Sequence, residues 1–336
     1  MPETMRVALD GTPLMGPLGG IRRFTDQLLL ALRAEFPTDN FTPLSDQFAP
    51  LPKGIEKRWW MFGLNRAMAR VEADLFHGTD FAVPYVKQRP CVMTVHDLSP
   101  WREPGAASAR VQSRCAMLLR LRIPDFVHTP SEAVREELIE RFRFPADRVV
   151  TIPLAAAAHF EAGTQDEGGP YFLCLGTLED RKNLGVLVKA MAILQARGLH
   201  CKLVLAGQAR DGYAVPQGEG ITWIGKQEEG LLPALYRNAT AVLYPSRYEG
   251  FGLPVVEAMQ CGAIVVASDI PVLREVGGDA ALYAHPESPE AWADTMSELW
   301  THPDPQRQAR SLEQAQHFSW QRTAAAFRQL YERCAG

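Results

Sequence analysis

The sequence predicts an α/β protein of two domains, and three observations point to this fold class. Short apolar runs rich in β-branched residues alternate with amphipathic helical patterns along the chain, which is typical of parallel sheets with helical crossovers. The length of 336 residues suits two domains of roughly 100 to 200 residues each. Small, polar and glycine-rich residues at 155–170 interrupt the pattern, as a linker would. Two lobes joined in this way imply a cleft.

Eight strands are predicted from the apolar runs, and they are spread evenly over the two halves of the chain. They cover residues 6–9, 91–95, 126–129, 149–152, 172–175, 202–205, 241–244 and 263–267. Asn183 is predicted to cap a helix over 184–197, whose apolar residues from Leu187 to Leu194 keep a spacing near 3.6. Because open parallel sheets bind ligands beyond the carboxyl ends of their strands, candidate site residues are sought in the loops that follow these strands.

Composition excludes several classes of protein. A chain that is 46% hydrophobic and 22% charged, with a formal charge of −4, is neither disordered, collagen-like nor a coiled coil, and a nucleic-acid-binding protein would be more basic. The six cysteines include no C-x-x-C pair and several stand in apolar runs, which favours reduced core residues. No signal-peptide pattern or membrane-spanning run is recognised, so we expect a cytoplasmic protein.

The first candidate loop, GPLGGIRRFT, follows the opening strand. Gly16, Gly19 and Gly20 let the backbone approach a ligand, and the start of the following helix offers unpaired N–H groups to an anion. The spacing is not G-x-G-x-x-G, and no acidic residue stands at a strand end about 20 positions further on, so a dinucleotide site is disfavoured. Taken alone, a tight turn required for packing explains these glycines equally well.

The second candidate is the pair His96-Asp97, which directly follows the predicted strand at 91–95. A histidine in this position can hydrogen-bond a bound ligand, and Asp97 can fix its tautomer or cap a helix. His77 stands in a similar place, but for this residue a structural role is the better interpretation.

The third candidate is the segment GTLEDRKN, from Gly176 to Asn183, between a strand and a helix. Arg181 and Lys182 cannot be stabilising the positive end of the helix dipole, so the site is predicted to bind an anion. Arginine offers a planar fork and lysine a mobile point charge, which together suit a diphosphate. Two solvated surface cations are the competing interpretation.

The fourth candidate is the loop after the strand at 241–244, and it carries the densest set of unusual residues. Glu249, Phe251, Gly252 and Leu253 lead into a helix that Pro254 is predicted to open. The exposed N–H groups form a nest for phosphate or sugar oxygens. Glu257, in the first turns of that helix, is placed to accept hydrogen bonds from a vicinal diol such as ribose, and Glu249 from sugar hydroxyls. The plainer alternative is that Glu249 pairs with Arg247 and Glu257 lies on a surface helix.

These motifs resemble glycosyltransferase family 4, whose members are retaining enzymes of the GT-B type. The similar segments cover nearly the whole chain, above all EGFGLPVVEAM, which matches the Glu-x7-Glu element of the family; the others include TVHDL, TPSEAVREEL, GTLEDRKNL, ASDIPVLREVGGDAAL and the closing FSW. The resemblance implies two Rossmann-like domains facing across a cleft. It divides the chain into an acceptor domain at 1–160, a donor domain at 161–317 and a final helix at 318–336 that packs back toward the first domain.

The resemblance also implies roles for individual residues. Arg181 and Lys182 are expected to contact the diphosphate of the donor, and Glu257 its ribose diol. Glu249 and His96 are expected to act on the donor sugar, with His96 reaching over from the N-terminal domain. Gly19, Gly20, Thr177 and the backbone of Phe251, Gly252 and Leu253 complete the implied donor site. Many members of the family have arginine in place of Thr177, which leaves Arg181 and Lys182 a larger share of the phosphate.

The variant GTLE-x-RKN looks like a subgroup rich in enzymes that use GDP-mannose. We therefore expect transfer of mannose from GDP-mannose to a saccharide or lipid-linked saccharide in the synthesis of a surface polysaccharide or glycolipid. A UDP-sugar donor (UDP-glucose or UDP-GlcNAc) and a sugar-nucleotide-binding partner protein without turnover remain open. The chain contains neither an Asp-x-Asp motif nor a His/Cys cluster with ligand spacing, so no metal or other cofactor is expected.

Residues 53–70 mix basic and aromatic side chains, including Trp59 and Trp60. This mixture suits an anionic membrane surface, with Arg110, Arg114, Arg120 and Arg122 extending the patch, and it predicts peripheral docking on the inner membrane leaflet. An amphipathic helix that buries its aromatic side chains in the first domain explains the same pattern.

Overall fold

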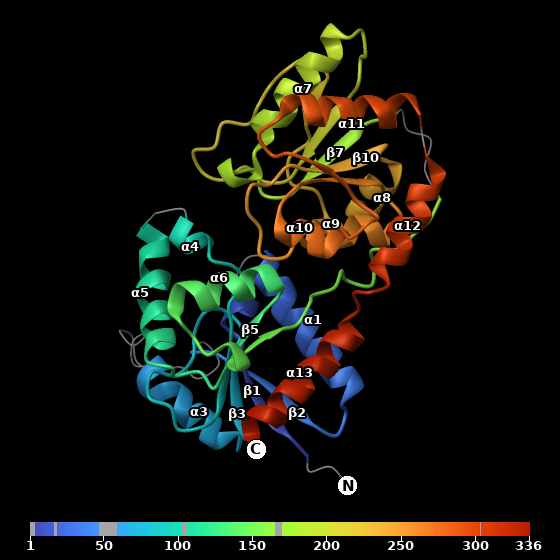
Figure 1. Ribbon diagram of the computed structural model, residues 1–336. Coiled ribbons are helices and arrows are strands. Elements are labelled where there is room, and N and C mark those ends of the chain that lie inside the picture. The colour runs from blue at the N-terminus through green and yellow to red at the C-terminus, as the bar shows by residue number, and fades with distance from the viewer. Residues whose placement is uncertain (1–3, 17–18, 47–58, 103–105, 165–169, 303) are drawn as a thin grey trace. The chain divides into compact units, whose positions relative to one another are not determined.

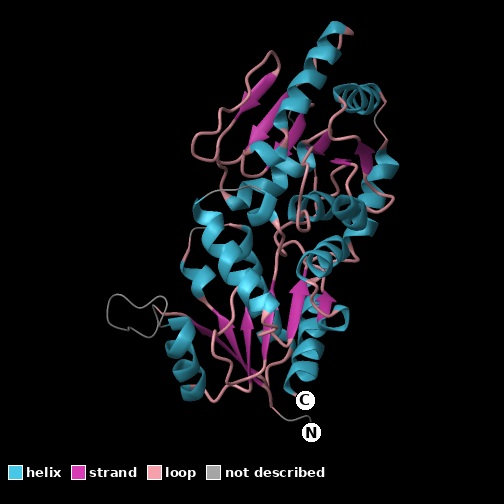
Figure 2. Cartoon of the chain, turned by 60° about the vertical axis from the view of Figure 1, so that its left-hand side comes forward, coloured by secondary structure: helices cyan, strands magenta, loops and turns pink. Residues whose placement is uncertain are grey.

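The computed structural model describes residues 4–16, 19–46, 59–102, 106–164, 170–302 and 304–336. The chain divides into two compact units, the first formed by Met1–Leu154 together with Ser319–Gly336 and the second by Ala155–Phe318. The boundary that the sequence suggests, after residue 160, falls within the second unit, a few residues past the division. Each unit is an α/β structure with its own parallel sheet (Figures 1 and 2).

The sheet of the first unit has six parallel strands in the order β2-β1-β3-β4-β5-β6. Its strands are β1 (Arg6–Asp10), β2 (Asn40–Leu44), β3 (Leu75–Gly78), β4 (Cys91–Thr94), β5 (Phe126–Thr129) and β6 (Val149–Thr151). Val7 and Leu9 of β1 are buried, as are all four residues of β3 and of β4, because helices cover both faces of a parallel sheet.

Helices lie on both sides of this first sheet (Figure 2). They are α1 (Gly20–Glu35), α3 (Leu64–Arg70), α4 (Ser99–Arg102), α5 (Ala106–Arg120), α6 (Glu132–Phe142) and α13 (Trp320–Ala335). The short turns are η1 (Thr12–Met15), η2 (Trp59–Gly63) and η3 (Ala146–Arg148). The final helix, α13, packs beside α1, where Phe24 lies 6.1 Å from Phe327 and 6.4 Å from Trp320, measured between ring centroids. The end of the chain is therefore part of the first unit.

A buried chain of hydrogen bonds joins α13 to the sheet of the first unit. His128 Nε2 donates to the Ile152 carbonyl at 2.9 Å, which leaves His128 Nδ1 to accept from Thr94 Oγ1 at 3.0 Å. Thr94 in turn accepts from His77 Nε2 at 2.8 Å, and His77 Nδ1 accepts from the Tyr331 hydroxyl at 2.7 Å. Burial lowers the pKa of His128 to about 3 and that of His77 well below its usual value, so both imidazoles are neutral. His77 thus has the structural role expected of it.

The sheet of the second unit is also six-stranded and parallel, in the order β12-β11-β10-β7-β8-β9. Its strands are β7 (Phe172–Leu175), β8 (Leu203–Ala206), β9 (Ile221–Trp223), β10 (Ala241–Tyr244), β11 (Val265–Ser268) and β12 (Leu282–Ala284). In the centre of the sheet, Leu173 of β7 stands opposite Val242 of β10 on one side and Val204 of β8 on the other. The apolar residues of these strands form the core of the unit.

In the second unit, helices follow β7, β9, β10, β11 and β12. They are α7 (Leu184–Ala196), α8 (Leu232–Asn238), α9 (Leu253–Gln260), α10 (Pro271–Gly277), α11 (Pro289–Thr301) and α12 (Pro305–Ala315), with the turns η4 (Asp180–Lys182) and η5 (Glu229–Leu231). Helices α7 and α11 lie side by side (Figure 1), and Leu187 and Met191 of α7 share one apolar cluster with Trp292 and Met296 of α11. This packing holds the start of α7, and the loop before it, against the carboxyl end of β7.

The α/β fold class with parallel sheets is confirmed, and all eight predicted strands are present. Four further strands, β2, β3, β9 and β12, were not predicted from the sequence. Three of them, β2, β9 and β12, are edge strands of three to five residues, and β2 contains Pro43, which only an edge strand tolerates well. Such short edges leave little periodicity to recognise.

All six cysteines are free and buried, as expected of core residues. Among the described residues, no helix is both long enough and apolar enough to cross a membrane.

Candidate functional site

The second sheet changes direction between β7 and β10. From β7 the chain builds outward through β8 to β9, and from β10 it builds the opposite way through β11 to β12. Loops that leave two adjacent strands in opposite directions create a crevice at the carboxyl edge, where ligands of open α/β sheets bind. Arg181 and Lys182 follow β7, and Glu249 follows β10, so the two strongest candidates from the sequence meet at this switch point.

Arg181 and Lys182 both contact the carboxylate of Glu249. Lys182 Nζ donates to Glu249 Oε1 at 2.6 Å, and Arg181 Nη1 donates to Glu249 Oε2 at 3.1 Å. Arg181 Nη1 also lies 3.2 Å from the carbonyl oxygen of Tyr248, next to Glu249 in the chain. Lys182 is 9% exposed and Glu249 6% exposed, which excludes the alternative of two solvated surface cations.

A second carboxylate extends this arrangement. Glu179 accepts from Arg181 Nε at 2.5 Å through one oxygen and from Arg210 Nη1 at 2.9 Å through the other. Arg181, Lys182, Arg210, Glu179 and Glu249 therefore form one cluster, which we call the cation cluster. Three positive charges against two negative charges leave it a net charge of +1, so it can take up an additional anion.

The cation cluster keeps Glu249 ionised in spite of its burial. Burial by itself raises the pKa of a carboxyl, but Lys182 and Arg181 outweigh this effect and bring the pKa of Glu249 down to about 2. The carboxylate is therefore charged at neutral pH. It holds the two cations at the carboxyl end of the sheet before any ligand is bound.

Tyr244, the last residue of β10, positions the ammonium group of Lys182. Lys182 Nζ donates to the Tyr244 hydroxyl at 2.7 Å and lies 4.6 Å from the centre of its ring. Burial, with Glu249 nearby, raises the pKa of Tyr244 well above its usual value, so its hydroxyl stays protonated. From the sequence, Tyr244 is predicted only to be part of a strand; its place at the carboxyl end of that strand is the signal that points to the site.

Glu257 lies on α9 and is buried, with 1% of its surface exposed. Its Oε2 accepts from the Tyr236 hydroxyl at 3.0 Å, and burial next to this carboxylate raises the pKa of Tyr236 well above its usual value. Glu257 is thus no surface residue, which removes the alternative considered for it. A carboxylate can accept several hydrogen bonds, so the contact with Tyr236 is compatible with the predicted role of Glu257 toward a diol. The role of Tyr236, on α8, had no local sequence signal.

Gly252 gives the loop before α9 its shape. Its φ of +97° lies in the left-handed region, and a Cβ on it would stand 2.9 Å from Leu273 Cδ2. The helix begins at Leu253, one residue before the predicted Pro254, and Phe251 is buried at 5% exposure. Glu249 and the first N–H groups of α9 therefore lie within a few residues of one another in the chain, and anion binding by these N–H groups stays a prediction.

The pairing of Glu249 with Arg247, the plainer alternative, does not occur. Arg247 instead binds Glu287 through two hydrogen bonds, of 2.5 and 3.0 Å. The prediction that Asn183 is the N-cap residue of α7 is confirmed by its position. Asn183 occupies the N-cap position, but its amide donates to the carbonyl oxygens of Pro245 and Pro286, because its left-handed backbone (φ 54°) turns the side chain toward the neighbouring loops.

The remaining candidates lie in two places. Thr177 is exposed in the loop after β7, between Gly176 and the cation cluster. Gly19 and Gly20 stand in the first unit at the N-terminus of α1, with Gly19 in the cap position. His96 is also in the first unit, where its Nε2 donates to the Thr79 carbonyl at 2.7 Å and its ring lies edge-on to Phe24.

Asp97 does not set the tautomer of His96. Its Oδ1 accepts from Ser99 N at 2.9 Å and Ser99 Oγ at 2.7 Å, so it binds the first residue of the short helix α4. The bond from His96 to Thr79 leaves His96 Nδ1 as the ring nitrogen that can accept. Among the described residues, no group of three or more His, Cys, Asp or Glu side chains is arranged to hold a metal ion.

Two family models match this chain. Residues 156–317 match the model described as glycosyl transferases group 1, and residues 19–156 match glycosyltransferase family 4. The chain is 35% identical over 278 residues to an O-antigen chain mannosyltransferase B of Escherichia coli, covering 74% of this chain and 71% of that protein. It is 24% identical over 233 residues to the O-antigen chain mannosyltransferase RfbU of Salmonella typhimurium, covering 67% of this chain and 65% of the relative.

Solved structures with the same fold cover almost the whole chain. A sucrose-phosphate synthase from Thermosynechococcus elongatus superposes with a TM-score of 0.76 at 21% identity, covering 98% of both chains. The Anabaena protein Alr3699/HepE, solved in complex with UDP-glucose, gives a TM-score of 0.72 at 17% identity, covering 98% of this chain and 100% of that one. These likenesses identify the fold as GT-B. With two matching family models and a relative at 35% identity, the chain belongs to glycosyltransferase family 4 and is a glycosyltransferase.

Proposed function

We propose that this glycosyltransferase transfers mannose from GDP-mannose to a saccharide or lipid-linked saccharide during synthesis of a surface polysaccharide of the O-antigen kind, with retention of anomeric configuration and without a metal ion. The observation that carries the chemistry is the convergence of Lys182 and Arg181 on Glu249 at the switch point of the second sheet. The donor sugar is proposed from the names of the relatives at 35% and 24% identity.

In this proposal the cation cluster receives the departing diphosphate. When the bond from the anomeric carbon to the phosphate breaks, negative charge grows on the diphosphate and positive charge on the sugar ring. Arg181 and Lys182 stabilise the first, with each charge-assisted hydrogen bond worth roughly 1.5 to 3 kcal/mol. The carboxylate of Glu249 steadies the second, since its low pKa keeps it ionised. In this proposal side chains and amide groups perform this task without a metal ion.

The remaining steps follow from the same groups. Glu257 accepts hydrogen bonds from the ribose hydroxyls, while the backbone of Phe251, Gly252 and Leu253 contacts the sugar and its phosphate. Thr177 contributes one hydroxyl to the phosphate. The roles proposed for Gly19, Gly20 and His96 in donor binding rest on the family resemblance. Retention is explained by attack of the acceptor from the face of the leaving group, with the departing phosphate taking the acceptor's proton.

A UDP-sugar donor is the second candidate, because the GT-B fold of this chain is shared with a protein solved with UDP-glucose. A binding protein without turnover is the third. A panel of sugar nucleotides separates all three, with release of free GDP or UDP as the measurement. Release of GDP from GDP-mannose above every other donor supports the proposal. Release of UDP alone selects the second candidate, and binding without any release selects the third.

We further propose that the first unit docks on an anionic membrane surface on the cytoplasmic side. Trp59 and Trp60 do not carry this docking, since they are buried at 2% and 7% exposure. Met61 (37% exposed) and Phe62 (54%) of η2 and Met117 (41%) and Leu121 (65%) at the end of α5 offer exposed apolar surface.

Basic side chains flank this apolar surface. Arg66, Arg70, Arg120 and Arg122 are exposed, and Arg114 joins the two segments by lying 5.6 Å from the centre of the Trp60 ring. Lys53, Lys57 and Arg58 of the predicted patch, and the side chain of Arg110, lie outside the described residues.

A further inference from the structure

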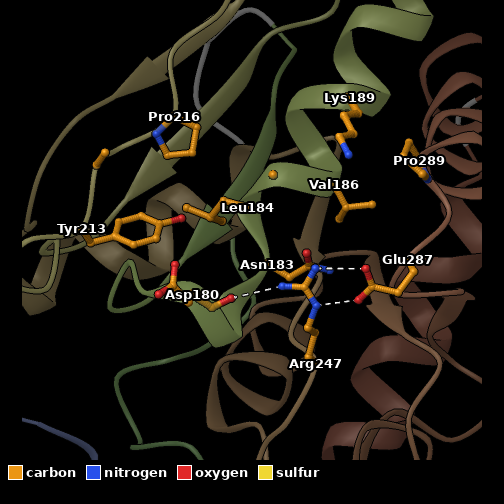
Figure 3. A pocket seen from close by; sticks show the side chains of 12 residues that line it. Asp180, Asn183, Leu184, Val186, Lys189, Tyr213, Pro216, Arg247, Glu287 and Pro289 are labelled. Carbon is orange, nitrogen blue, oxygen red and sulfur yellow. Dashed lines mark hydrogen bonds and ion pairs between the residues drawn. The ribbon is translucent and has the colours of Figure 1, made fainter. Parts of the chain in front are cut away.

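The second unit contains a pocket of about 380 Å³ beside the start of α7. It is bordered by the loops after β7, β8, β10 and β12, and its most informative side chains are Asp180, Lys189, Tyr213, Arg247 and Glu287 (Figure 3). Its volume falls within the range of about 300 to 1,000 Å³ that is usual for small-molecule sites. Neither Arg181, Lys182 nor Glu249 lines it, so it is separate from the proposed diphosphate site.

The charged groups of the pocket balance one another. Asp180 and Glu287 are matched by Lys189 and Arg247, which makes the lining neutral overall. Arg247 and Glu287 form a two-pronged ion pair (2.5 and 3.0 Å), and Arg247 Nη1 lies 3.4 Å from the Asp180 carbonyl oxygen. The polar groups are thus held in place before a ligand arrives. A neutral lining gives little attraction for a phosphate, in contrast to the cation cluster.

Apolar surface lies next to these charges. Leu184, Val186, Pro216 and Pro289 contribute aliphatic surface, and the half-buried ring of Tyr213 contributes an aromatic face (Figure 3). Burial raises the pKa of Tyr213, so its hydroxyl stays a protonated donor. Carboxylates and a guanidinium next to an aromatic ring match the chemistry of a sugar, whose hydroxyls both donate and accept hydrogen bonds and whose C–H face is apolar.

We propose that this pocket binds a neutral saccharide of one or two hexose units, as a second carbohydrate site distinct from the donor site. A backbone hydrogen bond links the pocket to the cation cluster, because the N–H of Arg247 donates to the carbonyl of Arg181 at 2.9 Å. A glycan held in the pocket is therefore fixed on the same unit as the donor. The inference goes beyond the proposed function, since it holds for any donor nucleotide that the enzyme uses.

The test is a titration of isotope-labelled full-length protein with mannobiose, followed by NMR at the amide groups of Gly185 and Ala214, both of which line the pocket. The variants are Tyr213→Ala and Glu287→Gln. The matched control is Arg197→Ala, which removes the exposed pair of Arg197 with Asp294 (2.7 Å) at the far end of α7. Tyr213→Ala removes the aromatic face and Glu287→Gln replaces a charged acceptor by a neutral one, so each is expected to raise the dissociation constant of mannobiose about tenfold, and the control is expected to match the wild type.

Three results overturn the proposal. The first is that mannobiose leaves the Gly185 and Ala214 signals in place, and the second is that it binds both pocket variants as tightly as the wild type. The third is that inorganic phosphate moves these signals and mannobiose does not, which makes the pocket an anion site. A parallel titration with GDP, followed at Thr177 and Gly252, reports on the proposed donor site. If GDP shifts the Thr177 and Gly252 signals but mannobiose leaves those of Gly185 and Ala214 unchanged, only the pocket proposal fails; the reverse result contradicts only the proposed donor site.

Discussion

Lys182 Nζ and Glu249 Oε1 lie 2.6 Å apart although 67 positions separate the two residues in the chain. The contact depends on the order of the second sheet, because only the adjacency of β7 and β10 brings the loops after them together. The pair is almost completely buried, and Arg181 adds a second cation to the same carboxylate. This ion pair is expected both to bind the leaving diphosphate and to stabilise the fold, and measurements of turnover and of stability separate the two effects.

Replacing Lys182 by alanine is expected to reduce turnover with GDP-mannose by about 100-fold or more, because a preorganised charge that stabilises the leaving group is lost. The measurement is the rate of GDP release. Lys202→Ala is the matched control, since Lys202 is exposed and precedes β8 at the opposite edge of the sheet. A Lys182→Ala variant that keeps full turnover while remaining folded contradicts the assignment of the leaving-group site.

The stability of the protein is expected to depend on pH through Glu249. Its pKa is about 2 in the folded protein, against 4.5 for an ordinary glutamate, so its ionised form stabilises the fold above about pH 4.5. This contribution, on the order of 3 kcal/mol, is lost as the pH falls toward 2. Denaturant unfolding of wild type and Glu249→Gln at several pH values measures it. The difference between the two is expected to stay constant above about pH 5 and to shrink below. A constant difference down to pH 3 contradicts the prediction.

Glu257→Gln is expected to weaken GDP binding about tenfold, because a charged acceptor for the ribose hydroxyls becomes a neutral amide. Tyr236→Phe, which removes only the hydroxyl that donates to Glu257 (3.0 Å), is expected to weaken binding less. Isothermal titration with GDP compares both variants with the wild type. Unchanged affinity in Glu257→Gln would remove Glu257 from the donor site.

Gly252→Ala is expected to destabilise the second unit by about 1 to 3 kcal/mol, since a side chain at this positive φ is strained. Its Cβ would also crowd Leu273 Cδ2 at 2.9 Å. Thermal unfolding provides the measurement. Gly230→Ala is the control, because a Cβ there meets no atom within 4 Å. Equal melting temperatures for the two variants argue against a strained loop.

The docking proposal predicts that Met61→Ser combined with Phe62→Ser lowers co-sedimentation with anionic vesicles severalfold, because exposed apolar side chains at a headgroup surface are removed. Leu231→Ser is the control, since Leu231 is similarly exposed (52%) but belongs to the second unit. The docking proposal is contradicted if the double variant sediments with the vesicles as much as the wild type does, or if the wild type does not sediment with them.

Local sequence patterns predicted much of this structure. The apolar runs located the central strands, and the loop residues Arg181, Lys182 and Glu249 were selected because they follow strands of a parallel sheet. The short edge strands β9 and β12 were not predicted, since three residues of partly exposed chain carry no clear period. Periodicity also gave no information about which strands are neighbours.

Contacts between segments far apart in sequence lay beyond such patterns. Asparagine is a common helix-cap residue, yet the side chain of Asn183 donates to the carbonyl oxygens of Pro245 and Pro286, which only the folded sheet brings near. Tyr244 and Tyr236 support Lys182 and Glu257 from other elements of the unit. The charged residues of the candidate site could thus be chosen from the sequence, whereas the side chains that hold them in place could not.

The most direct test of the central claim is the structure of the protein in complex with GDP. We predict that oxygens of the β-phosphate lie within hydrogen-bonding distance, about 3 Å, of both Lys182 Nζ and the Arg181 guanidinium. A complex in which the diphosphate lies elsewhere, with Lys182 and Arg181 still bound only to Glu249 and its neighbours, would contradict the account.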